Sequence, residues 1–450
     1  MESTSDRRLL MAEDGLVGGS LAGLCLARLQ HFAREKGWRG FGLVGPGVLI
    51  AVGYVDPGNW ATDLSGGARY GFELLSVVLL ANLVAAMAQA LCVRLGIVTG
   101  KGLAEVCRES FSRPVVMLLW FLTEIAMVAT DLAELVGSAV ALKLLFGIGL
   151  LPGVLIVSAG TFVVLSLGLS DRKLSGLVAL LMLVVAVSFT VLLVLARPHW
   201  LEVVAGLLPT PTLIVDPSML LIAIGIVGAT VMPHNLYLHS GLLAVVGRRL
   251  EAGSQRSTEV KKAAIRAGAL DSSLSLTIAF FMNAAILIAA GAVFHANGLH
   301  EVSSLSSAYR LLDPVLGSGI AATLFAVALL AAGQSSTITG TLAGQMITEG
   351  FLRIRLSPLI RRLITRGAAL GPAILYFSLA GEDNSAHLLI ASQVVLSLQL
   401  PFALVPLVHF TASRRLMGDL AVGRRTALCC WAMALLLVGL NVLLIGDMVA

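Results

Sequence analysis

Two four-residue motifs with metal-ligating side chains each interrupt a long apolar stretch of the chain. The motif DPGN occupies residues 56–59, and the motif MPHN occupies residues 232–235. Proline has no amide hydrogen and clashes with the preceding helical turn, so each motif predicts an opened helix. Opened backbone at membrane depth is tolerated only where protein buries it or where it lines a cavity. A carboxylate, amides, a thioether and an imidazole at such a place suit a metal cation better than an organic solute.

The composition indicates a membrane protein. Hydrophobic residues make up 57% of the 450 residues and charged residues only 13%, and the mean hydropathy is +0.93. That much apolar surface could not be kept from water in a soluble domain. The five cysteines form no CxxC pattern and their number is odd, so the sequence implies no disulfide framework.

Apolar runs of membrane-crossing length predict an all-α polytopic protein with eleven transmembrane helices. The first and sixth helices are discontinuous because they contain the two motifs. The ninth run is the least apolar, since three arginines lie in its first half. The runs fall near 43–70, 74–99, 115–146, 149–169, 174–196, 217–246, 265–294, 314–348, 357–379, 386–411 and 426–447.

The positions of the basic residues predict the orientation. With the N-terminus inside, only four of the 31 Lys and Arg residues fall in outside segments, namely Arg69, Lys143, Arg197 and Arg310, and the other 27 fall inside. Such an excess is typical of cytoplasmic segments. We therefore expect a multi-pass protein of the plasma (inner) membrane with a cytoplasmic N-terminus and a C-terminus on the periplasmic or extracellular side.

Residues 1–40 are expected to form a cytoplasmic tail. Arg7-Arg8 followed by an apolar run superficially resembles a signal peptide, but Glu13 and Asp14 interrupt the pattern and the run is short and rich in glycine. We expect no cleavage. Residues 26–38 have the pattern of a basic amphipathic helix on the membrane surface.

The spacing of the two motifs predicts an inverted repeat. They begin 176 positions apart, at 56 and 232, and five crossings separate them. An odd number of crossings per unit inverts the second unit. The expected organisation is residues 41–199 with helices 1–5, residues 214–412 with helices 6–10, and residues 424–450 with helix 11 and the C-terminus. This alignment pairs Asp56 with Met232 and Asn59 with Asn235.

The two breaks predict a binding site for a transition metal. We expect the first half-helix to end at Asp56 and the corresponding half of helix 6 to end near Ala229, and both ends expose carbonyl oxygens. Asp56 adds a charge, Asn59 an amide oxygen and Met232 a thioether, which favours Mn²⁺ or Fe²⁺ over Mg²⁺ and Ca²⁺. The alternative to metal ligation is a structural role for each residue: Asn59 caps the second half-helix and Met232 packs in the core.

Three acids on the third helix point to a proton path. Glu124, Asp131 and Glu134 are spaced to share one helical face, and three buried acids cannot all stay charged without partners. The alternative is a static ion-pair network between helices 3 and 9. His234 lies beside the second break and is either a tuning group or a packing histidine. His234 and His239 diverge by about 140° on a helix, so they form no chelating pair.

The chain resembles the Nramp family of divalent-metal transporters, close to its bacterial proton-coupled manganese members. The paired DPGN and MPHN motifs are very specific, and the resemblance covers roughly residues 40–445. The matching stretches are Gly45-Pro46-Gly47 with Tyr54 through Asn59, then residues 66–71, 129–134 and 228–240, and the stretch that begins at Gly333 and ends at Phe351.

The resemblance implies a LeuT-like fold and specific site residues. It assigns metal-ligand roles to Asp56, Asn59, Met232 and the carbonyl of Ala229, and in some transport states to Gln393. It also implies a proton route that runs from Asp56 to Asp131 and on through the positions of Glu134 and Glu124. Arg361 and Arg362 line the inner end of this route, and His234 lies near its start.

We therefore expect a proton-coupled importer of Mn²⁺, and also of Fe²⁺, that works by alternating access and is not an enzyme. Its expected partners are the metal ion, protons and the bilayer, with no cofactor, no nucleic acid and a monomeric state. An amino-acid or sodium-coupled symporter of the same fold is the main alternative, although Asp56 and Met232 argue against an anionic substrate group. A membrane-embedded metalloenzyme would need a motif such as HExxH, which is absent. A metal sensor would need a sizeable soluble domain.

Overall fold

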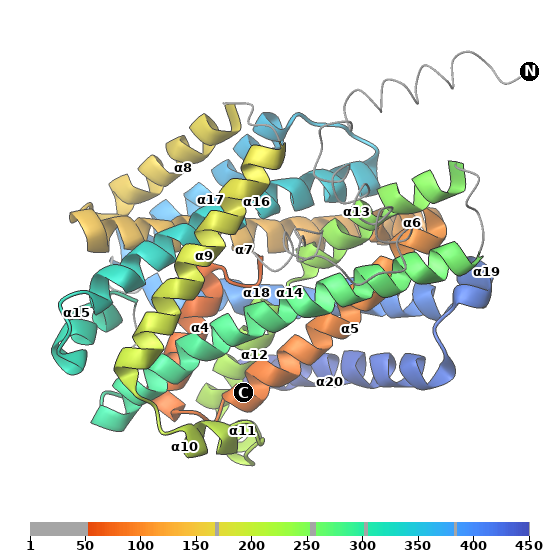
Figure 1. Ribbon diagram of the computed structural model, residues 1–450. Helices are drawn as coiled ribbons and strands as arrows, with labels where there is room; N and C mark the ends of the chain where they lie inside the picture. Colours follow the sequence, from red (N-terminus) through yellow and green to blue (C-terminus); the bar gives the residue numbers. More distant parts are fainter. Residues whose placement is uncertain (1–52, 167–170, 253–257, 301–304, 382–384, 450) are drawn as a thin grey trace, which may run out of the picture.

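The computed structural model describes residues 53–166, 171–252, 258–300, 305–381 and 385–449, and helices make up most of these ranges (Figure 1). No strand occurs within them, so the prediction of an all-α protein is confirmed there. The helices before the second break are α4 (Pro57–Tyr70), α5 (Leu75–Thr99), α6 (Leu103–Ser110), α7 (Arg113–Phe146), α8 (Leu150–Ser166), α9 (Asp171–Ala196), α10 (Trp200–Ala205), α11 (Thr212–Val215) and α12 (Pro217–Val231).

The helices after the second break complete the bundle. They are α13 (Pro233–Ala252), α14 (Thr258–Val293), η1 (His295–Asn297), α15 (Leu305–Leu316), α16 (Ala321–Leu352), α17 (Pro358–Ala380), α18 (Ser385–Ala412), α19 (Arg414–Met417), η3 (Gly418–Leu420) and α20 (Arg424–Val449). In Figure 1, α6 and α19 lie at one end of the bundle and α15 lies at the other.

Eight helical segments within the described residues are long and apolar enough to cross a membrane. Three of the eleven expected crossings do not meet that test. Most of the first half-helix lies outside the described residues, the fourth crossing offers only the shorter apolar helix Leu150–Val163, and α17 carries three arginines. The chain is thus a multi-pass membrane protein, and the count of eleven stays a prediction.

The boundary predicted for the eighth crossing is wrong. The apolar run near 314–348 contains two helices, because α15 ends at Leu316 and α16 begins only at Ala321. Gly317 adopts a positive φ of 60°, which glycine tolerates without steric cost. The carboxylate of Asp313 then accepts a hydrogen bond from the backbone amide of Ala322 at 3.0 Å. Apolar length alone could not separate an amphipathic helix from the crossing that follows it.

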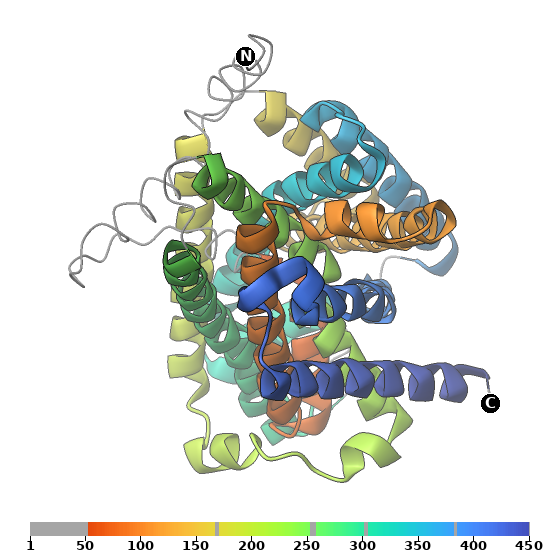
Figure 2. The same ribbon diagram turned by 90° about the vertical axis from the view of Figure 1, so that its right-hand side faces the viewer.

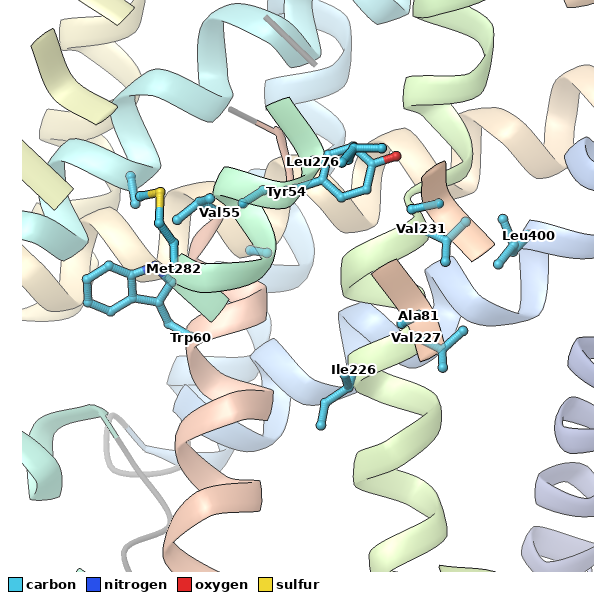
Figure 3. Close-up of a cluster of buried hydrophobic side chains, with 14 of the residues drawn as sticks. Tyr54, Val55, Trp60, Ala81, Ile226, Val227, Val231, Leu276, Met282 and Leu400 are labelled. Atoms are coloured by element: carbon cyan, nitrogen blue, oxygen red, sulfur yellow. The ribbon is translucent and has the colours of Figure 1, made fainter. Parts of the chain in front are cut away.

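The two breaks lie in the buried core. Figure 3 shows Tyr54 and Val55 at the first break, Val227 and Val231 on α12 and Leu400 of α18 as members of one cluster of buried side chains. All five side chains are at most 4% exposed. By contrast, α20 lies at the edge of the bundle when the molecule is viewed from the end that carries α19 (Figure 2). The breaks are therefore enclosed by protein, as opened backbone at membrane depth requires.

Candidate metal site

The first break is stabilised by side chains that replace lost backbone hydrogen bonds. Pro57 has no amide hydrogen, so the carbonyl of Gly53 has no intrahelical donor four residues on. Asp56 caps α4, because its Oδ1 accepts the backbone N–H of Asn59 at 2.9 Å. The carbonyl of Tyr54 accepts hydrogen bonds from the side-chain amides of Asn59 and of Asn283, the latter at 2.9 Å. The amide nitrogens of the Asn59 and Asn283 side chains are therefore both held at this break.

The second break comes two residues later than expected. The helix α12 ends at Val231 and not near Ala229. The carbonyl of Ala229 nevertheless loses its donor four residues on, because that position is Pro233. Met232 has a φ of 34° and a ψ of 99°, a conformation that costs a non-glycine residue on the order of 1–3 kcal/mol. Strain of this kind is typical of binding sites, and here it falls on the predicted thioether ligand.

Polar side chains from the second break and from α18 lie against the first break. The side-chain amide of Asn235 donates to the sulfur of Met232 at 3.6 Å, and a Cβ built on Gly53 would lie 2.5 Å from that same amide nitrogen. A Cβ on Gly58 would overlap the side-chain amide of Gln393. Glycine at 53 and 58 thus allows both amides to lie against the first break.

Five buried side-chain oxygens near the breaks have no hydrogen-bond partner within the described residues. They are Asp56 Oδ2, Asn59 Oδ1, Asn235 Oδ1, Asn283 Oδ1 and Gln393 Oε1. A buried acceptor without a donor costs on the order of 1–3 kcal/mol, and a cation would satisfy several of them at once. The described residues contain no cluster of three His, Cys, Asp or Glu side chains. The polar groups available to a cation at the breaks are one carboxylate, amides, carbonyls and a thioether, and their role as metal ligands stays a prediction.

The predicted site residues lie at the breaks as expected. Asp56, Asn59, Met232, Ala229 and Gln393 are all at most 1% exposed. Gly228 allows α18 to approach, since a Cβ there would overlap the backbone carbonyl of Gln393. Asn283 and Asn235 were not among the predicted ligands. The inverted repeat had paired Asn235 with Asn59, which indicated a site role for it. Asn283 could have been found because it is a polar residue inside an apolar helix.

A buried network of charges lies beside the site, between α7 and α17. Arg362 forms ion pairs with Asp131 and with Glu134, the latter at 2.8 Å. Arg366 lies 3.5 Å from the Glu134 carboxylate and 4.0 Å from that of Asp131. Arg361 pairs with Glu124 at 2.7 Å. The shared helical face that the sequence predicted for the three acids therefore faces α17.

Arg366 was missed as a member of this network. It follows Arg362 by four positions, so it lies on the same helical face, and that spacing could have identified it. Its guanidinium also donates to the hydroxyl of Thr337 at 3.1 Å, and that hydroxyl donates to Glu134 at 2.9 Å. The second carboxylate oxygens of Asp131 and Glu134 have no hydrogen-bond partner among the described residues. The network thus fits both a static set of ion pairs and a set of proton acceptors.

The two histidines of α13 differ in their surroundings. His234 is buried, and its Nδ1 lies 3.4 Å from the hydroxyl of Thr130, the residue before Asp131. His239 contacts Gln89 at 2.6 Å and Ser272 at 3.4 Å. Their partners lie on different helices, as the angle between them predicted. His234 therefore lies between the second break and the charge network.

A further buried acid, Asp63, was not predicted. It lies on α4 seven residues after Asp56, on nearly the same helical face, and is 2% exposed. Its Oδ2 has no hydrogen-bond partner within the described ranges. The sequence pattern DPGNWATD contained this signal, because an acid seven residues after the break is as unusual in an apolar helix as the first.

With this geometry in place, comparison with known proteins identifies the family. The sequence profile of the family described as natural resistance-associated macrophage protein-like, Nramp, matches residues 47–447. This chain belongs to the Nramp family. Nramp proteins are membrane transporters and not enzymes, so the expectation of a transporter is confirmed.

Relatives and solved structures agree with this assignment. The chain is 49% identical over 405 residues to the divalent metal cation transporter MntH of Bradyrhizobium diazoefficiens, covering 90% of this chain and 89% of that one. It is similar to the Eremococcus coleocola manganese transporter with a TM-score of 0.79 and 36% identity, covering 91% and 88% of the two chains. The transporter MhsT, solved with L-phenylalanine, shares the fold alone, with a TM-score of 0.58 and 15% identity over 92% and 99% of the chains.

Proposed function

We propose that this Nramp protein imports divalent transition metals, Mn²⁺ and also Fe²⁺, together with protons, by alternating access. The observation that carries the proposal is a set of buried side-chain oxygens without a hydrogen-bond partner among the described residues, which lie with Met232 at the two helix breaks. Its relatives with printed functions are a divalent metal cation transporter and a manganese transporter. The metal ion is the cargo, and the site therefore needs to release it as well as bind it.

The proposed ligands are Asp56, Asn59, Met232, the carbonyl of Ala229 and, in some transport states, Gln393. Asp56 is the one formal charge among these donors, and the carbonyl end of α12 adds partial negative charge. A hard cation such as Ca²⁺ prefers six to eight oxygen ligands, so the sulfur at Met232 disfavours it. The softer Mn²⁺ and Fe²⁺ accept this mixed set more readily.

The proposed proton route starts at Asp56 and continues through His234, Asp131, Glu134 and Glu124. Binding of a divalent cation favours the ionised form of Asp56, and the proton it releases needs an acceptor nearby. The carboxylate oxygens of Asp131 and Glu134 that have no partner in the described part of the chain offer that acceptor. Arg361 and Arg362, together with Arg366, compensate the negative charge that remains after the proton has left.

We further propose eleven crossings with a five-plus-five inverted repeat, a cytoplasmic N-terminus, an outside C-terminus and a monomeric state. The tail 1–40, the repeat units 41–199 and 214–412 and the segment 424–450 remain the proposed organisation. The shared fold with MhsT and the charge distribution support this arrangement.

Mn²⁺ binding to purified protein tests the site. We expect Asp56→Asn to weaken Mn²⁺ binding by more than about 100-fold. Loss of a residue that only hydrogen-bonds to a metal ligand already lowers metal affinity by about 10–100-fold, and Asp56 is proposed as a direct ligand. Asp216→Asn is the matched control. Asp216 is the partly exposed N-cap of α12, and asparagine caps a helix equally well, so the control should bind like the parent protein. Undiminished binding by Asp56→Asn would refute the proposed site.

A further inference from the structure

A basic turn connects α18 to α20 at the end of the bundle that also carries α6 (Figure 1). It contains four exposed arginines and one acid, Asp419. The arginines occur as two pairs, one at the start of α19 and one at the start of α20, namely Arg414, Arg415, Arg424 and Arg425. No ion pair within the described residues involves any of the four. All four side chains are exposed, so an external anion can approach their charge.

The turn encloses a surface cavity of about 560 Å³. Arg414 and Arg424 line it from opposite sides of the turn, together with Asp419 and the small residues Gly418 and Gly423. One residue from each arginine pair thus contributes to the same cavity. Arginine residues from two helix starts that border one cavity suit the binding of a phosphate group, because guanidinium groups form strong charge-assisted hydrogen bonds to phosphate.

Hydrogen bonds hold the turn in place. The guanidinium of Arg94 on α5 donates to the carbonyl of Leu420 at 2.8 Å. The backbone amide of Val422 donates to the carbonyl of Thr411 on α18 at 3.0 Å. The cavity is therefore preformed, and a ligand would not have to order it.

An apolar stripe on α20 begins one turn beyond the cavity. Leu428, Leu435 and Val442 repeat every seven residues, so they share one helical face, and they are 73%, 67% and 62% exposed. This face lies on the edge helix in Figure 2. A bound molecule with a phosphate in the cavity could thus lay an acyl chain along the same helix. A soluble phosphate would make no use of this stripe.

We propose that the cavity binds the phosphate headgroup of an anionic membrane lipid, with its acyl chain along α20. Basic pockets at the membrane ends of helices are known to hold such headgroups. This inference rests on the membrane location of the chain, and it is independent of the proposed metal site.

Lipid binding to the full-length protein in detergent, followed by native mass spectrometry, tests the proposal. The probes are phosphatidylglycerol, phosphatidylcholine and inorganic phosphate. We expect phosphatidylglycerol to bind, and Arg414→Gln/Arg424→Gln to weaken it by at least about tenfold. Phosphatidylcholine should bind more weakly than phosphatidylglycerol, and the double variant should not change its binding. Arg113→Gln/Arg353→Gln removes the same charge from two other exposed arginines, and it should bind like the parent protein.

Three results would overturn the inference. They are equal binding of both lipids, undiminished phosphatidylglycerol binding by Arg414→Gln/Arg424→Gln, and binding of inorganic phosphate without any lipid preference. Should the double glutamine variant fail to fold, Arg424→Gln alone and the charge-conserving Arg414→Lys/Arg424→Lys take its place. The single variant should weaken binding, and the lysine pair should retain the preference for the anionic lipid.

Discussion

Met232 and Asp56 occupy corresponding places at the two breaks, but one contributes a sulfur and the other a charge. We expect Met232→Ala to keep Mn²⁺ uptake while admitting Ca²⁺ or Mg²⁺, because the vacated space can be filled by water oxygen. The preference for Mn²⁺ over Ca²⁺ should fall by roughly tenfold, or about 1.4 kcal/mol of differential binding. Flux of each ion into liposomes measures this, and an unchanged preference would refute the role of the thioether.

Asp131 distinguishes a proton path from a static network. We expect Asp131→Asn to keep metal transport and to lose metal-driven proton flux, because the amide cannot accept the proton and still contacts Arg362. Parallel readings of metal entry and of a pH-sensitive dye in vesicles separate the two fluxes. Normal proton entry in this variant would leave the ion pairs with Arg362 as a structural feature only.

Sequence reasoning found the residues next to the two breaks and missed charged residues that lie farther along the helices. Asp56 and Met232 stood out because each adjoins a proline in an apolar helix. Arg366 was seen only as a charge that weakens a membrane helix, since its partners Asp131 and Glu134 lie more than 200 positions away. Asp63 was overlooked because the prediction considered only the break at residues 56–59 and not the rest of α4. The four-residue spacing from Arg362 could have placed Arg366 on the same helical face, but spacing along one helix does not show which acids that face meets.

At the scale of elements, close contact between α12 and α18 keeps Gln393 beside the first break. We expect Gly228→Ala to separate these helices, because its Cβ would overlap the carbonyl of Gln393 and lie 2.7 Å from the backbone nitrogen of Ser397. Overpacking of this kind costs about 1–3 kcal/mol, and Mn²⁺ binding should weaken with it. Thermal unfolding in detergent measures the change.

Gly439→Ala in α20 is the matched control for this prediction. A Cβ at Gly439 meets nothing within 4 Å, so alanine should leave stability unchanged or raise it by up to about 1 kcal/mol. Equal stability of the two variants would show that α12 and α18 do not need their close approach.

The helices themselves were largely predictable, and their ends were not. Apolar length located α5, α7, α14 and α18, since a crossing needs about 20 apolar residues whatever its neighbours are. The start of α16 was misplaced because Leu305–Leu316 is an amphipathic helix of its own. The end of α12 was predicted two residues early, because Met232 adopts a backbone conformation that no propensity favours.

At the scale of the whole molecule, the charge distribution predicts which end of the bundle faces the cytoplasm. In a chain whose own cysteines are replaced by alanine, Ser318→Cys between α15 and α16 should react with an impermeant maleimide in intact cells. Thr258→Cys at the start of α14 should react only after the cells are opened. Thr258 is exposed and Ser318 is partly exposed. The reverse pattern would invert the proposed orientation, and with it the direction of import.

The central claim is that the two breaks carry a transition metal together with protons. It is tested most directly by a panel of metal ions in proteoliposomes of the parent protein, with metal entry and internal pH read at the same time. We predict uptake of Mn²⁺ and Fe²⁺ accompanied by internal acidification, and no uptake of Ca²⁺ or Mg²⁺. Equal uptake of all four ions, or entry of Mn²⁺ without any change of internal pH, would contradict the account.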